Sequence, residues 1–283
     1  MTKHPKYLYP LKNCFHPKNL NMFDLAGKLF LSLLTIIFIC FINPTTTLAQ
    51  PAFLSYYCEN SANYTVNSPY QRNLDTTLTA LPTTNNGFGF YNLTTGQGYD
   101  TVHSVALCRG DVNPDACRSC VNDSIVNLGQ LCPNQKEAIG YYDNCMVKYS
   151  NQVILGNTGI KFYVYLANTQ NATDIDQFNS DLSPLLKKLR VRAAAGGSLQ
   201  KFASGSTKGP GFSTIYGLVQ CTPDLSETQC SDCLEDIIGR ISLYFNGRVG
   251  GRILLPMCTF RYETYRFFNK SAPVIHYPRH LLR

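Results

Sequence analysis

A cysteine pattern that occurs twice constrains the fold more than any other feature of this chain. The spacing C-x8-C-x2-C is followed in both copies by one further cysteine, and all four positions recur at the same offset of 113 residues. The pairs are Cys108 and Cys221, Cys117 and Cys230, Cys120 and Cys233, and Cys145 and Cys258. Since no insertion or deletion separates these anchors, the sequence predicts two copies of one unit of roughly 100 residues.

The N-terminal segment has the pattern of a secretory signal peptide at residues 22–49. Lys28 provides the positive flank, residues 29–42 form an apolar core, and Thr47 and Ala49 form a small-x-small site. We therefore expect cleavage after Ala49, with the residues before Met22 as an upstream extension. The alternative is an uncleaved membrane anchor, for which the apolar core is short. No later run reaches membrane length, so we expect an exported chain without a membrane span.

The charge of the mature chain argues against nucleic acid as a partner. Residues 1–49 contain five of the 25 basic residues and one of the 18 acidic residues, so 20 basic and 17 acidic residues remain. The net charge falls from +7 to +3. A balance this small provides no electrostatic footprint for a polyanion.

Cysteines and glycosylation motifs both favour a secretory route. Two of the 12 cysteines lie in the segment that we expect to be removed, which leaves ten. An even number in an exported chain indicates a disulfide framework. Five N-x-S/T motifs predict N-glycosylation at Asn63, Asn92, Asn122, Asn171 and Asn269.

The repeat narrows the disulfide pairing. The first copy has two cysteines that the second copy lacks, Cys58 and Cys132, and losing both halves of one bridge leaves no free thiol. This predicts the pair Cys58–Cys132 and reduces the connectivities of the first copy from 15 to three. Among those three we favour the pairing that closes short loops. The other predicted pairs are Cys108–Cys117, Cys120–Cys145, Cys221–Cys230 and Cys233–Cys258.

Zinc is the alternative explanation for the two C-x2-C pairs. Structural zinc sites use cysteine and histidine ligands, but the mature chain has only three histidines, His103, His276 and His280. Together with export and the even cysteine count, this favours disulfides. We expect no metal site and no cofactor.

Hydrophobic periodicity predicts the same elements in both copies. Helical stripes occur at Leu74, Leu78 and Leu81 and again from Phe178 to Leu189, and a second helix follows each C-x8-C motif, with Asp115 expected as the cap in the first copy. Expected strands are 54–58, 101–108, 139–150 and 160–166 in the first copy, and 213–221, 253–257 and 258–268 in the second. Segments 193–201 and 204–211 are interpreted as small and flexible. The fold class is α+β, two helices against an antiparallel sheet, twice.

Four stretches now resemble a known family. They are the C-x8-C-x2-C motif, TIYGLVQCTPDLS at 214–226, GGR at 250–252 and C-x-x-R-Y-E at 258–263. They resemble the ginkbilobin-homologous, or stress-antifungal, domain of plant cysteine-rich repeat secretory proteins, which also forms tandem ectodomains of cysteine-rich receptor-like kinases and plasmodesmata-located proteins. The resemblance implies two helices on a five-stranded antiparallel sheet and agrees with the bridges above. We place the domains at 52–167 and 172–268 and a loose tail at 269–283.

The resemblance implies a binding protein. We expect a secreted protein of plant apoplastic defence or signalling, without catalysis, whose partners are receptor ectodomains or cell-wall carbohydrate. The alternatives are a mannose-binding antifungal protein and a truncated ectodomain of a cysteine-rich receptor-like kinase. The second copy departs from the family at Tyr244 and Phe245, where two adjacent cysteines often stand.

The family's mannose site implies candidate residues in the second copy only. It uses an Asn just after the first cysteine, an Arg six residues before the last cysteine and a Glu five residues after it. The first copy has Glu59, Ile139 and Ser150 there, whereas the second has Arg252 and Glu263. Arg can donate to sugar hydroxyls and Glu can accept from them. The alternative is a structural ion pair between Arg252 and Glu263 on adjacent strands.

An enzyme is disfavoured by the residues themselves. No nucleophile and base stand in a convincing pattern, and combining Ser213 or Ser242 with His103 would be arbitrary. Asp232, Glu235 and Asp236 fall on a solvated helix face rather than in a carboxylate pair. The aromatic residues Tyr262, Tyr265, Phe267 and Phe268 are interpreted as core between the domains rather than as a binding face.

Overall fold

The structure, a computed structural model, describes residues 29–34, 51–59, 61, 63–159 and 162–269. Both repeats belong to one compact unit, Gln50–Arg283. Residues 29–34 are helical, while the rest of the expected signal peptide and the tail beyond residue 269 lie outside the described residues. No helix in the described part is long and apolar enough to cross a membrane.

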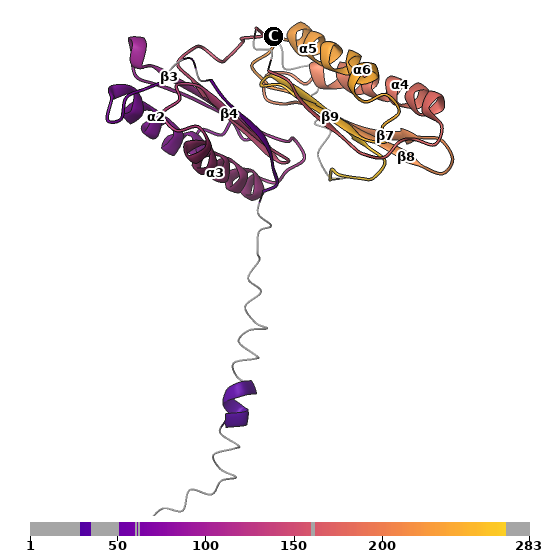
Figure 1. The fold of residues 1–283 in the computed structure, drawn as a ribbon, viewed down its shortest axis with the longest axis horizontal. Helices are drawn as coiled ribbons and strands as arrows, with labels where there is room; N and C mark the ends of the chain where they lie inside the picture. Colours follow the sequence, from indigo (N-terminus) through magenta and orange to yellow (C-terminus); the bar gives the residue numbers. More distant parts are fainter. Residues whose placement is uncertain (1–28, 35–50, 60, 62, 160–161, 270–283) are drawn as a thin grey trace, which may run out of the picture. The chain divides into compact units, whose positions relative to one another are not determined.

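The first repeat is an antiparallel sheet with two long helices on one of its faces (Figure 1). Its strand order is β1-β4-β5-β3-β2. The strands are β1 (Phe53–Cys58), β2 (Phe90–Thr95), β3 (Val102–Cys108), β4 (Ala138–Tyr142) and β5 (Cys145–Ser150). The helices are α2 (Pro69–Ala80) and α3 (Pro114–Leu131), with short 3-10 turns at Leu81–Thr83 and Gly98–Asp100.

The second repeat has the same layout. Its strand order is β6-β9-β10-β8-β7, again antiparallel throughout. The strands are β6 (Val164–Ala167), β7 (Lys201–Lys208), β8 (Thr214–Cys221), β9 (Gly251–Leu254) and β10 (Cys258–Glu263). The helices are α4 (Ile175–Ala194), α5 (Glu227–Gly239) and α6 (Ile241–Tyr244). The prediction of an α+β tandem of two helices on a five-stranded antiparallel sheet is confirmed.

Three predictions about single elements were wrong. The strand expected at 160–166 as the last strand of the first copy is the edge strand β6 of the second sheet, where it pairs with β9. The segments 193–201 and 204–211 were expected to be small and flexible, but α4 extends to Ala194, and β7, at Lys201–Lys208, pairs with β8. The edge strand β2 was also missed. Strands β2 and β7 contain mainly polar or small residues such as Asn, Thr, Ser, Gly and Lys, whereas a buried strand is typically rich in β-branched and aromatic residues.

Side-chain caps fix the starts of the second helix in each repeat. Asn113 rather than Asp115 caps α3, because its side chain accepts a hydrogen bond from the backbone N–H of Ala116, and Pro114 follows at the first helical position. In the second repeat Ser226 and Gln229 form a reciprocal capping box at the start of α5. Both caps place a cysteine on the buried side within the first turns.

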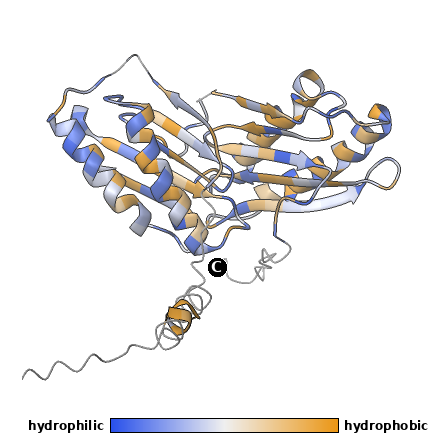
Figure 2. Cartoon of the chain, turned by 60° about the horizontal axis from the view of Figure 1, so that its bottom comes forward, coloured by the Kyte–Doolittle hydropathy of each residue, from blue (hydrophilic) through white to orange (hydrophobic). Residues whose placement is uncertain are grey.

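Each sheet is buried on both faces, which explains its continuous apolar strands. One core lies under α2 and α3, and another lies under α4 and α5. A third cluster joins the opposite faces of the two sheets and includes Val105, Ile139, Met146 and Leu254. Strands β4, β5 and β9 are therefore buried along their whole length. Figure 2 shows hydrophilic and hydrophobic residues sharing the same helices, as expected for helices with one buried face.

In the described part of the chain five disulfides connect helices and strands, and they are the Cys58–Cys132 pair that the repeat predicts and the four pairs favoured because they close short loops. They are Cys58–Cys132, Cys108–Cys117, Cys120–Cys145, Cys221–Cys230 and Cys233–Cys258. The strand register locates the bridge that the second repeat lacks. Cys58 pairs with Ala138, and Ala167 pairs with Gly251, which lies 113 residues after Ala138. The counterpart of Cys58 is therefore Ala167, not a residue near Asn171, and the counterpart of Cys132 is the buried Phe245.

Candidate functional site

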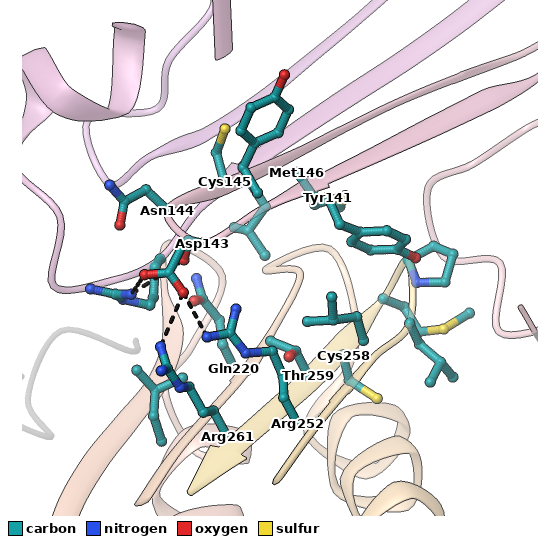
Figure 3. Close-up of a pocket in the computed structure, with 18 of the residues that line it drawn as sticks. Tyr141, Asp143, Asn144, Cys145, Met146, Gln220, Arg252, Cys258, Thr259 and Arg261 are labelled. Carbon is teal, nitrogen blue, oxygen red and sulfur yellow. Dashed lines mark hydrogen bonds and ion pairs between the residues drawn. The ribbon is translucent and has the colours of Figure 1, made fainter. Parts of the chain in front are cut away.

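A cluster of charged side chains lies where the two sheets meet. Asp143 stands in the turn between β4 and β5 of the first repeat, and Arg252 and Arg261 stand opposite each other on β9 and β10 of the second. Arg252 Nη2 donates to Asp143 Oδ1 at 2.6 Å, and Arg261 Nη1 donates to the same oxygen at 3.0 Å. Figure 3 shows Asp143 projecting from the first repeat toward both guanidinium groups.

A third arginine holds the other side of the Asp143 carboxylate. Arg109 Nη1 donates to Asp143 Oδ2 at 3.0 Å, and Arg109 also pairs with the buried Asp111 at 2.6 Å. Arg261 in turn donates to Glu263 Oε1 at 3.2 Å. Arg109 and Arg261 thus each have a carboxylate besides Asp143, whereas Arg252 pairs with Asp143 alone among the described residues.

Burial and charge act in opposite directions on these groups. Burial alone would raise the pKa of Asp143, but Arg252, Arg109 and Arg261 outweigh it and hold the pKa of Asp143 below its ordinary value. For Arg252, burial lowers the pKa, the charge of Arg261 lowers it further, and Asp143 only partly compensates. Burial and the neighbouring Arg261 thus both disfavour the charged form of Arg252, and Asp143 favours it.

A cavity of about 60 Å³ adjoins the cluster. Its lining is mostly apolar and includes Leu218 and Leu254 of the second repeat and Met146 of the first. Tyr141 of β4 also lines it, and its buried hydroxyl has no hydrogen-bond partner among the described residues. The cavity thus has a charged end, formed by Arg109, Asp143, Arg252 and Arg261, and a wall that is mostly apolar.

The two repeats match the family model described as "Salt stress response/antifungal" at residues 57–152 and 166–265. The chain belongs to this family. Among similar curated proteins, cysteine-rich repeat secretory protein 38 of Arabidopsis thaliana is 38% identical over 221 residues, which cover 78% of this chain and 87% of that protein. Cysteine-rich receptor-like protein kinase 25 of the same plant is 41% identical over 80% of this chain. The chain spans about a third of the length of that kinase, 34%.

Solved structures with the same fold are tandem ectodomains of two Arabidopsis thaliana proteins. The tandem DUF26 ectodomain of the cysteine-rich receptor-like protein PDLP5 matches with a TM-score of 0.62 and 28% identity, over 75% of this chain and 98% of that one. The ectodomain of PDLP8 matches with a TM-score of 0.66 over 76% of this chain and 99% of that one. At 21% identity the PDLP8 likeness concerns the fold alone.

The two residues that match the family's sugar site lie in the charged cluster but do not pair with each other. Arg252 donates to Asp143, while Glu263 accepts from Arg261 and, at 3.4 Å, from Asn168. Each is only 9% exposed. The alternative of a direct ion pair between Arg252 and Glu263 is therefore wrong, because each side chain pairs with another residue of a wider charged network. In the first repeat Ser150 donates to Glu137, and Ile139 belongs to the apolar cluster between the sheets.

Sequence reasoning missed Asp143, Arg109 and Tyr141. Comparing the two copies at the 113-residue offset would have given one signal. Arg252 corresponds to the apolar Ile139, and Asp143 corresponds to Pro256, so a charge stands in one copy where the other has none. The comparison of the two copies could not have indicated which of these charged residues form ion pairs.

The five predicted glycosylation sites are all exposed in the structure. Two of them have engaged side chains. Asn171 accepts a hydrogen bond from Arg248 at 2.9 Å, and Asn269 donates to the carbonyl oxygen of Asp111 at 3.1 Å. The side chains of Asn63, Asn92 and Asn122 make no such contact among the described residues. Glycosylation itself stays a prediction.

The aromatic residues near the C-terminus have different environments. Tyr262 is buried in the core of the second repeat, not between the repeats. Phe267 lies under the guanidinium of Arg261, 4.2 Å from its ring centre, and Tyr265 is exposed. Among residues that sequence reasoning weighed for catalysis, Ser213 donates to Pro210 and His103 contacts Thr94, so the described contacts do not join them. No group of three potential metal ligands occurs in the described residues.

Proposed function

We propose that this chain is a secreted protein of plant apoplastic defence or signalling that acts by binding and without catalysis. The main support is that two antifungal-family domains, with ten cysteines in five disulfides, cover almost all of the described part. Disulfide-dense domains of this size belong to oxidising compartments. The relatives agree with this proposal, since they include a secretory protein and ectodomains.

The arrangement of the repeats favours recognition of a large partner. The two sheets use their inner faces for contact with each other, which joins them by an apolar cluster and by Asp143. The helices and edge strands of both repeats then remain as outward surfaces. Such a tandem offers two related surfaces in a fixed relation, which suits a receptor ectodomain or a cell-wall polymer better than a small substrate.

Secretion is tested by expressing the full chain with a C-terminal tag in leaves. We expect the tagged protein in apoplastic wash fluid, with Gln50 as its first residue and with sugar on Asn63, Asn92 and Asn122. A control variant that lacks residues 29–42 should stay inside the cell. Recovery of the full chain from the membrane fraction, with residues 22–49 still attached, would support the anchor alternative instead. Crosslinking in the same tissue would identify receptor ectodomains as partners.

A mannose-type glycan is the second candidate ligand, and Arg252 supports it. Its only side-chain hydrogen bond to a described residue uses Nη2, so Nε and Nη1 remain as donors, and Arg252 lines the cavity. Glu263 would accept from a sugar hydroxyl. Calorimetry with mannose and mannan should give saturable binding that Arg252→Ala/Glu263→Ala loses. The control Arg248→Ala/Glu235→Ala removes the same charges elsewhere in the second repeat and should bind as the unaltered chain does.

The coverage of the kinase relative supports a third reading, an ectodomain of a cysteine-rich receptor-like kinase. The chain matches 34% of that relative. Sequencing of full-length transcripts from the source tissue tests this reading. A transcript that continues from the codon of Arg283 into a membrane span and a kinase domain would support it, and a stop codon there in every transcript would contradict it.

A further inference from the structure

Three tyrosine rings form a row along one edge of the second repeat. Tyr165 stands on the edge strand β6 and Tyr163 directly precedes this strand, and their ring centres lie 5.8 Å apart with the ring planes only 11° apart. Tyr244 of α6 stacks on Tyr165 with ring centres 4.0 Å apart. Tyr244 is nevertheless 44% exposed, and its outer face meets no other ring and no cation among the described residues.

A polar pair continues this row. The guanidinium of Arg240 lies 4.2 Å from the ring centre of Tyr163 and pairs with Asp236 at 3.0 Å. The hydroxyl of Tyr163 donates to Asp236 at 2.8 Å. Burial raises the pKa of Tyr165, as does a hydrogen bond with Tyr244, whereas the charge of Arg240 lowers it. The side chains of Arg240 and Asp236 are 31% and 47% exposed. These five residues, named here the tyrosine surface, thus present a ring face beside hydrogen-bonding groups.

The first repeat reaches the same fold without this surface. Both sheets have the same strand order, yet neither Arg240 nor Tyr244 has a counterpart of its own kind. The residues 113 positions earlier are Asn127 and Leu131. The fold therefore does not require an arginine and a tyrosine at these positions, as expected for a site added to a shared scaffold. No glycosylation motif occurs between residues 172 and 268, so none of the predicted glycans is attached to this part of the second repeat.

The chemistry of the tyrosine surface narrows the class of ligand. An exposed ring face packs against a flat apolar group, and a donor beside an acceptor suits hydroxyl groups, which both donate and accept. Arg240 is balanced by Asp236, and Asp232, one turn earlier on α5, is exposed and forms no ion pair with a described residue. An anionic ligand would be repelled by this residual negative charge. A neutral ring that is rich in hydroxyls and has an apolar face meets all these conditions.

We propose that the tyrosine surface binds a neutral β-linked glucan, with one glucose ring on the outer face of Tyr244 and neighbouring hydroxyls at Arg240 and Asp236. In β-glucopyranose all ring substituents are equatorial, so the axial C–H bonds form an apolar face on both sides of the ring. The axial hydroxyl of mannose interrupts one of these faces. This inference rests on the proposed binding function and specifies its cell-wall polymer. The site is separate from Arg252 and Glu263.

Soluble hexasaccharides test the ligand by calorimetry with the secreted chain. Cellohexaose and laminarihexaose consist of the same β-glucose units and differ only in linkage. At least one of them should bind saturably with a Kd on the order of 1 mM, as expected for an open surface, and the one that binds identifies the linkage. Mannohexaose should bind several-fold more weakly because of its axial hydroxyl. Hexagalacturonate, which is anionic, should bind at least tenfold more weakly.

Variants of Tyr244 test the site. Tyr244→Ala should weaken binding of the glucose hexasaccharide at least tenfold, whereas Tyr244→Phe, which keeps the ring, should change it no more than about twofold. Tyr99→Ala is the matched control, because it removes a tyrosine that is 96% exposed in the first repeat, and it should bind as the unaltered chain does. Circular dichroism checks that each variant is folded.

The outcomes separate this site from the proposed function. No binding of either glucose hexasaccharide at about 10 mM would overturn the proposal, whereas secretion and partner crosslinking would be unaffected, since neither depends on glucose. Unchanged binding by a folded Tyr244→Ala variant, together with loss in Arg252→Ala/Glu263→Ala, would overturn the site and assign sugar binding to the charged cluster. Equal affinity for mannohexaose would overturn the stated preference for glucose.

Discussion

The carboxylate of Asp143 in the first repeat lies 2.6 Å from the guanidinium of Arg252 in the second. The same carboxylate also contacts Arg261 and Arg109, each at 3.0 Å. One acidic side chain thus contacts three cations at the contact between the sheets, two of which also pair with Asp111 or Glu263. The turn between β4 and β5 provides it, so the position of this turn is tied to the second sheet by charge as well as by apolar packing.

Replacing Asp143 should therefore destabilise the chain. In Asp143→Ala, Arg109 keeps Asp111 and Arg261 keeps Glu263, but Arg252 is left buried without a carboxylate. Breaking a buried pair from one side costs about 3–5 kcal/mol, and since the Asp143 side chain is 28% exposed, we expect a loss of about 2–3 kcal/mol. Urea denaturation followed by tyrosine fluorescence measures it.

Asp115→Ala is the matched control for Asp143. The side chain of Asp115 is 85% exposed, and its nearest cation, Arg118, lies 4.0 Å away. Exposed pairs of this kind contribute at most about 1 kcal/mol. Equal losses for the two variants would mean that the Asp143 cluster contributes no more to stability than a surface pair.

Low pH should remove the contribution of Asp143 selectively. The pKa of Asp143 lies below its ordinary value of 3.8 because Arg252, Arg109 and Arg261 outweigh the effect of burial. A depressed pKa in the folded state gives stability that is present above the unfolded pKa and is lost as the pH falls through the folded pKa. The difference in free energy of unfolding between the unaltered chain and Asp143→Asn should stay constant from pH 7 to pH 5 and shrink below about pH 4. A difference that persists at pH 2 would contradict this assignment.

Phe245 should replace much of the stability that the missing bridge gives the first repeat. It occupies the position of Cys132, is 1% exposed, and packs edge-on against Phe260 with ring centres 6.3 Å apart. Phe245→Ala should cost about 3–5 kcal/mol, since it opens a cavity in the core. Removing the Cys58–Cys132 bridge should cost about 2–4 kcal/mol in the first repeat.

The neighbour of Phe245 provides the control. Tyr244 is 44% exposed, although its ring stacks on Tyr165 at 4.0 Å. Tyr244→Ala should cost about 1 kcal/mol, clearly less than Phe245→Ala in the same thermal or urea denaturation experiment. A larger loss at Tyr244 would indicate that the surface stack, rather than the buried ring, replaces the bridge.

The sequence predicts the architecture because its constraints are repeated and local. Cysteines at a fixed offset give the two copies and their pairs, and apolar periodicity gives α2, α4 and the central strands. Strands β2 and β7 escape prediction because they are edge strands of polar composition, and pairing with β3 and β8 contributes to their stability. Strand β6 was assigned to the wrong sheet because its sequence fits either edge.

The candidate site was predictable only in part. Arg252 and Glu263 stand in motifs that the family resemblance marks, but their partners come from elsewhere in the chain. Asp143 is 109 residues from Arg252, and a turn residue carries no periodic signal. The cavity and the unpaired Tyr141 hydroxyl depend on how two sheet faces fit together, which local spacing does not encode.

Gly217 should be required by the close approach of α4 to the second sheet. It pairs with Gly205 on β7, and a Cβ at Gly217 would lie 3.1 Å from Leu189 and 3.2 Å from Leu185, both on α4. These leucines are held in the core, so Gly217→Ala should destabilise the chain by about 1–3 kcal/mol through overpacking. Gly239→Ala is the control, because a Cβ there meets nothing within 4 Å and alanine favours a helix end by up to about 1 kcal/mol. We expect a lower melting temperature for Gly217→Ala and an equal or higher one for Gly239→Ala. If Gly217→Ala has the same melting temperature as the unaltered chain, α4 has room to move away from the sheet.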